Sequence, residues 1–149
     1  MNTKEGTAAP KGCAPLTGSA VVFRVQDRDG RGPWKPGFSD RWVEDRTDEE
    51  YSALIPFPLD VMLSLRAAAG RRHMAYACET LDQLRRWFRP GEYQTLLRFG
   101  YHAVKLDVDD VLIRSDSQCC FVRSRPLRAG VERINLYPQN DQGQPAAAE

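Results

Sequence analysis

The chain has 149 residues, of which 42% are hydrophobic and 28% are charged. This composition is typical of a folded protein, and the length supports one hydrophobic core rather than two. The 21 Lys and Arg residues nearly balance the 20 Asp and Glu residues, for a formal net charge of +1. Because a surface that binds nucleic acid usually shows a clear basic excess, this balance disfavours nucleic acid as a partner.

Export, membrane insertion and metal binding find little support in the sequence. No apolar run approaches the roughly 18 residues of a membrane span, and residues 1–20 lack the pattern of a secretory signal. The four cysteines form no Cys-x-x-Cys pair, and two histidines are few for a zinc site. We therefore expect a soluble, cytoplasmic protein without membrane contact or metal, in which three cysteines are small buried side chains: Cys78, Cys119 and Cys120.

The composition changes near both ends of the chain. Residues 1–18 and 138–149 mix Gly, Ala, Pro and polar residues without periodicity, which predicts disordered tails. Residues 19–137 show periodic apolar patterns. For this part we expect a single small α+β domain, with a mixed or antiparallel sheet of about five strands, two or three short helices and one long loop.

The N-terminal part of the predicted domain combines a strand with a long loop. Residues 20–25 form a β-branched and aromatic run that predicts a strand carrying Arg24. Residues 26–58 have no sustained period, and a structureless connection beyond about 15 residues is usually functional or disordered. Plain disorder is disfavoured by three aromatic residues, Trp34, Phe38 and Trp42. This loop is therefore the first place to look for a binding site.

The middle of the chain predicts a helix, a strand and a second, capped helix. The first helix covers residues 59–69, and the strand covers residues 73–78. Thr80 is followed three residues later by Gln83, which is the pattern of a capping box at a helix N-terminus. We expect the arginines of this helix, Arg85 among them, to face mainly water.

The C-terminal part predicts one more short helix and the remaining strands. We expect the helix between Pro90 and Gly100, and the glycine marks its C-terminal end. Apolar residues 111–113 follow a turn. Strands are predicted over residues 101–108, 118–122 and 131–137.

Common catalytic motifs are absent. The sequence contains no Gly-x-Gly-x-x-Gly dinucleotide fingerprint, no Walker-type phosphate loop and no Gly-x-Ser-x-Gly. Three polar side chains remain on separate predicted strands. Arg24 lies on the first strand before the long loop, Tyr76 on the second strand before the capped helix, and Gln118 at the start of a late strand, two residues after Asp116.

This layout resembles the three-motif arrangement of ADP-ribosyltransferase-like domains, which include RES-type toxins and a small anti-CRISPR transferase. In that family a first-strand Arg or His grips the dinucleotide, a second-strand Tyr or Ser precedes a helix, and a late Glu, Asp or Gln acts on the nicotinamide ribose. The resemblance covers residues 21–122. It implies that NAD is bound by three residues, Arg24, Tyr76 and Trp34, and that Gln118 takes the catalytic position, with Asp116 as its substitute.

The chemistry of these residues fits such roles in part. The planar guanidinium of Arg24 suits pyrophosphate oxygens, and the Tyr76 ring can stack on a flat base. Most active transferases have Glu at the third position, whereas Gln118 is a neutral amide. An amide hydrogen-bonds a ribose hydroxyl but does not stabilise an oxocarbenium cation as a carboxylate does.

Other interpretations of the same residues stay open. Arg24 could form an ion pair with Asp27 or Glu44 on a solvent-facing strand, Tyr76 could pack in the core, and Gln118 could be an ordinary polar strand residue. A different function is also compatible with the sequence. In that case the chain is a non-catalytic interaction module, such as a phage or accessory factor, that binds a protein partner through the loop from Trp34 to Trp42.

Overall fold

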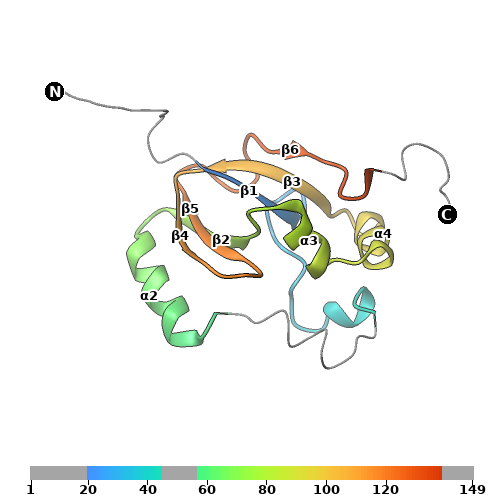
Figure 1. The fold of residues 1–149 in the computed structure, drawn as a ribbon, viewed down its shortest axis with the longest axis horizontal. Helices are drawn as coiled ribbons and strands as arrows, with labels where there is room; N and C mark the ends of the chain where they lie inside the picture. Colours follow the sequence, from blue (N-terminus) through green and yellow to red (C-terminus); the bar gives the residue numbers. More distant parts are fainter. Residues whose placement is uncertain (1–19, 45–56, 139–149) are drawn as a thin grey trace.

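The computed structural model describes residues 20–44 and 57–138. Apart from residue 138, both predicted tails lie outside these ranges, and so does part of the predicted loop. The described residues form an α+β fold with six strands in two three-stranded antiparallel sheets, together with three α-helices and one short 3-10 helix (Figure 1). The predicted fold class is thus confirmed, with one strand more than expected. The domain boundaries remain a prediction.

The first sheet has the strand order β1-β3-β6. Strand β1 (Ala20–Gln26) pairs along its whole length with β3 (His102–Val108). Strand β6 (Glu132–Arg133) has only two residues, whereas the sequence predicted a strand over 131–137. The rest of that segment instead fills the core, because the side chains of Leu136 and Tyr137 are buried.

The second sheet has the strand order β2-β5-β4, formed by β2 (His73–Ala77), β5 (Cys119–Arg123) and β4 (Asp110–Arg114). Every residue of β5 is buried, as expected for a central strand with neighbours on both sides. Strand β4 is the additional strand. The sequence showed only apolar residues after a turn there, and pairing with β5 turns them into a strand with an irregular register between Val111 and Ile113.

The two sheets meet where β1 runs past the end of β2. Phe23 and Cys78 form an antiparallel bridge, in which each backbone N–H donates to the other residue's carbonyl oxygen at 2.8 Å. The bridge places the end of β2 beside the middle of β1. Residues that are about 50 positions apart in the sequence are therefore neighbours here, and the candidate site lies next to this junction.

Three α-helices accompany the sheets: α2 (Leu59–Ala69), α3 (Leu81–Trp87) and α4 (Pro90–Arg98). Helix α2 lies beside the second sheet, and α4 lies at the opposite end of the molecule (Figure 1). The predicted capping box is confirmed at α3, since Thr80 Oγ1 accepts the Gln83 N–H at 3.1 Å and Gln83 Oε1 accepts the Thr80 N–H at 3.2 Å. Among the described residues, no helix is long and apolar enough to cross a membrane.

One expectation for α3 is wrong. Arg85 does not simply face water, because its Nε donates to the carbonyl oxygen of Leu136 at 2.8 Å and its guanidinium lies over the Tyr137 ring. The Tyr137 hydroxyl in turn donates to the carbonyl oxygen of Phe88. Arg85 therefore holds the segment after β6 against α3, a contact between residues about 50 positions apart.

The core has two parts. One lies among β1, α3, α4 and the last described segment, and it is built largely from aromatic and leucine side chains such as Trp42, Leu84, Phe88, Tyr93 and Leu96. The other lies among strands of both sheets and includes Val22, Leu106 and Phe121. The three cysteines predicted to be buried are buried and free: Cys78, Cys119 and Cys120.

Candidate functional site

A cavity of about 320 Å³ opens beside the junction of the two sheets. Its walls come from β1, the loop after it, β2, α3 and the residue that precedes β5. Four of the five residues singled out in the sequence line this cavity: Arg24, Trp34, Tyr76 and Gln118. The other lining residues are Val25, Gly32, Pro33, Met74, Ala75, Ala77, Cys78, Leu84, Trp87 and Phe88.

The bridge between Phe23 and Cys78 explains why distant residues meet at this cavity. Arg24 directly follows Phe23 on β1, and Tyr76 lies two residues before Cys78. The loop after β1 comes close because residue 32 is a glycine. A Cβ atom added to Gly32 would lie 3.2 Å from Arg24 Nη2, which is tighter than ordinary contact.

Arg24 is the most unusual group in the cavity. Its side chain is only 8% exposed, and neither Nε nor Nη1 has a hydrogen-bond partner among the described residues. Burial lowers the pKa of Arg24 from 12.5 to about 10, although the nearby Asp27 carboxylate acts in the opposite direction. A buried, unpaired guanidinium is costly. Since the side chain is buried, the interpretation as an ion pair on a solvent-facing strand is wrong.

Tyr76 adds a second unsatisfied polar group. Its hydroxyl is buried without a hydrogen-bond partner in the part of the chain that the structure describes, and its ring packs against the ring of Phe57 with centroids 6.0 Å apart. Burial raises the pKa of Tyr76, with Cys120 acting in the same direction, so the phenol stays neutral and keeps its O–H donor. Buried polar groups are nearly always paired in native proteins, and each exception needs an explanation. Arg24 and Tyr76 are two such exceptions in one cavity.

Aromatic rings form a further wall. The Trp34 ring lies 4.7 Å from the Trp42 ring and 6.4 Å from the Trp87 ring, both edge-on. Trp87 is held in place because its Nε1 donates to the carbonyl oxygen of Ser117 at 2.8 Å. Trp42 is 2% exposed and belongs to the core, whereas Trp34 is 54% exposed. The aromatic face that the loop offers to solvent is thus mainly that of Trp34.

The two residues assigned to catalysis lie apart. Gln118 lines the cavity, but Asp116 does not and is exposed. Its carbonyl oxygen accepts hydrogen bonds from Gln83 Nε2 at 3.0 Å and Arg86 Nη1 at 3.5 Å, which fasten this turn to α3. No carboxylate is found among the described residues that line the cavity. The described part of the chain also holds no cluster of His, Cys, Asp or Glu suited to a metal ion.

Sequence reasoning missed the contribution of α3. Leu84, Trp87 and Phe88 have the spacing of an apolar helix face that packs in the core, yet all three also line the cavity. The cavity is therefore an opening at the edge of the core rather than a separate surface groove. Their apolar helical spacing does not distinguish core from cavity wall, because both environments favour the same side chains.

Comparison with known protein families matches residues 16–135 to the Bacteriophage T4 Y00F protein family. The match extends over most of the chain. The chain belongs to this family. A relation to phage proteins, which the sequence analysis named as an example of an interaction module, is therefore shown. No curated protein and no solved structure matches the chain significantly. Neither the Y00F family description nor the other comparisons point to ADP-ribosyltransferases.

Proposed function

We propose that this member of the Y00F family binds NAD in the cavity beside the sheet junction, in the manner of ADP-ribosyltransferase-like domains. The observation that carries the proposal is that Arg24 lines the cavity and has two buried guanidinium nitrogens without a hydrogen-bond partner among the described residues. A bound pyrophosphate compensates this charge, because its oxygens match the planar N–H fork. A cytoplasmic location, where NAD is plentiful, is part of the proposal.

The remaining walls suit the flat parts of such a ligand. Trp34 and Trp87 offer aromatic surface for a ring, and the unpartnered Tyr76 hydroxyl is available to donate a hydrogen bond. The volume of about 320 Å³ lies at the low end of the range for small-molecule sites. We therefore place one nucleotide half of NAD inside the cavity and the other half across the rim at Trp34.

Transfer of ADP-ribose to a protein target is the finer part of the proposal. In that reaction the bond between ribose C1′ and nicotinamide breaks, nicotinamide leaves, and an acceptor nucleophile bonds to C1′. The Gln118 amide is suited to hold a ribose hydroxyl but not to stabilise the cation. We expect Gln118→Glu to increase the release of nicotinamide, since it adds a carboxylate at this wall.

Isothermal titration calorimetry with NAD, nicotinamide mononucleotide and AMP tests the binding step. Arg24→Gln is expected to weaken NAD binding at least about tenfold, and Tyr76→Phe about three- to tenfold, because a charged contact is worth more than a neutral one. Arg98→Gln is the matched control, since Arg98 is exposed on α4 and contacts Thr95. Absence of binding to the wild-type protein at millimolar NAD would refute the proposal.

A second function, binding of a protein partner, is favoured by one observation. Trp34 is 54% exposed although tryptophan is usually buried, and exposed tryptophans are common anchors at interfaces. In this case Trp34→Ala should abolish capture of the partner, while Arg24→Gln should leave it unchanged. The calorimetric experiment separates the two functions, because an interaction module has no reason to bind a dinucleotide.

A further inference from the structure

A second cavity, of about 180 Å³, lies where the end of β1 meets β3 and the segment before and within β6. It is separate from the first cavity, since the two share no lining residue. Its polar lining consists of Gln26, Asp27, Arg28, His102, Arg128 and Arg133. No step of the proposed NAD binding uses any of these side chains.

The charge around this cavity is unbalanced. The three arginines, Arg28, Arg128 and Arg133, are all exposed, and none has a side-chain hydrogen bond or an ion pair within the described ranges. Asp27 is the one acidic lining residue, and its Oδ1 already accepts two backbone N–H groups at 2.9 Å. Three permanent positive charges therefore surround the opening against one engaged carboxylate.

The pKa of His102 also reflects the positive charge at this cavity. Burial lowers the pKa of His102, and the positive charge of Arg133 acts in the same direction. The imidazole is thus neutral near pH 7, and it can still donate one N–H to an acceptor.

Gln26 supplies a second and independent observation. Its side chain is 2% exposed, and its Nε2 donates to the carbonyl oxygen of Leu127 at 2.9 Å. This bond fixes the orientation of the amide, so the other atom, Oε1, is an acceptor. Oε1 is buried and has no hydrogen-bond partner within residues 20–44 and 57–138. An acceptor of this kind calls for a ligand with an O–H or N–H donor, which a bare anion does not provide.

We propose that this second cavity binds a small phosphorylated ligand that carries a free hydroxyl, of the sugar-phosphate class. The phosphate oxygens accept hydrogen bonds from the arginines, and a sugar hydroxyl donates to Gln26 Oε1. The volume of about 180 Å³ is below the usual range for drug-sized ligands and suits a monosaccharide phosphate.

The test compares ribose 5-phosphate, inorganic phosphate and ribose as ligands of the full chain by calorimetry. Ribose 5-phosphate should bind more tightly than inorganic phosphate, and ribose alone should not bind measurably. The double variant Arg128→Gln/Arg133→Gln should weaken ribose 5-phosphate binding at least about tenfold. Both side chains are exposed, so this variant should fold normally, which circular dichroism verifies.

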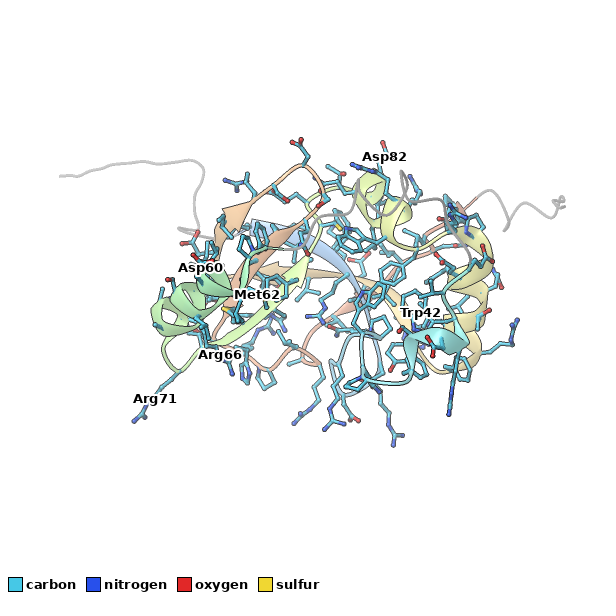
Figure 2. The ribbon with its side chains drawn as sticks, turned by 90° about the horizontal axis from the view of Figure 1, so that it is seen from below. Trp42, Asp60, Met62, Arg66, Arg71 and Asp82 are labelled. Atoms are coloured by element: carbon cyan, nitrogen blue, oxygen red, sulfur yellow. The ribbon has the colours of Figure 1, made fainter. Side chains whose placement is uncertain are left out.

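Two controls separate this site from the first cavity and from general charge. Arg71→Gln should leave binding unchanged, because Arg71 points away from the domain (Figure 2). Tyr76→Phe, at a residue that lines only the first cavity, should also leave it unchanged, so failure of NAD binding does not affect this result. Equal affinity in the wild type and the double variant would overturn the proposal. Tighter binding of a short single-stranded oligonucleotide than of ribose 5-phosphate would overturn it as well.

Discussion

Replacement of Arg24 by methionine should stabilise the free protein while abolishing its response to NAD. Burial lowers the pKa of Arg24 from its usual value to about 10, and each tenfold change in proton affinity is equivalent to about 1.4 kcal/mol. Burial, partly offset by the attraction of Asp27, thus costs the charged guanidinium about 3 kcal/mol. Methionine is unbranched and carries no charge, so it removes this cost while filling much of the same space.

The expected net gain is smaller than this cost. Methionine is shorter than arginine, and the space it leaves unfilled costs about 1 kcal/mol. We therefore expect Arg24→Met to raise the free energy of unfolding by about 1–2 kcal/mol. Substitution of a residue that binds a ligand at the expense of stability increases the free energy of unfolding of the free protein, whereas substitution of a structural residue decreases it.

Urea titrations with and without NAD measure both effects. The wild-type protein should gain stability as NAD saturates the cavity, and Arg24→Met should not. Arg98→Met is the control, because Arg98 is exposed, and we expect a change below about 0.5 kcal/mol there. A loss of more than about 1 kcal/mol in Arg24→Met without ligand would show that Arg24 is a structural group, and the reasoning about its uncompensated charge would fail.

The remaining predictions concern local structure, measured as free energies of unfolding in urea. Thr80→Ala removes the side-chain acceptor of the capping box and should lower the free energy of unfolding by about 0.5–2 kcal/mol. Gln94→Ala, on the exposed side of α4, is the control and should lower it by less than about 0.5 kcal/mol. Equally small losses in both variants would contradict the cap. Gly30→Ala should cost about 2–5 kcal/mol, because a φ of +86° combines with a Cβ placed 2.9 Å from that of Leu127. Gly37→Ala, at a φ of +74° with no atom within 4 Å, should cost only about 1–2 kcal/mol, and similar losses at both glycines would argue against the close contact.

Elements whose signals are local were predicted well from the sequence. The capping box at Thr80 needs only hydrogen bonds to Gln83, three residues away, and the helix over residues 59–69 has the bounds that its pattern indicated. Strand β4 was not predicted, because its short apolar run becomes a strand only through pairing with β5. The role of Arg85 was also hidden, since its partner Leu136 lies 51 positions further along the chain.

The candidate site likewise combines features that the local sequence predicts with features that depend on distant residues. The sequence by itself placed Arg24, Tyr76 and Gln118 on separate strands, because alternation and strand composition are properties of neighbouring residues. Only the tertiary structure decided that these residues share one cavity, through the bridge between Phe23 and Cys78. The tertiary structure also decided that Arg24 is buried and that its Nε and Nη1 have no partner among the described residues, because burial depends on segments that are distant in sequence and meet only in the folded chain.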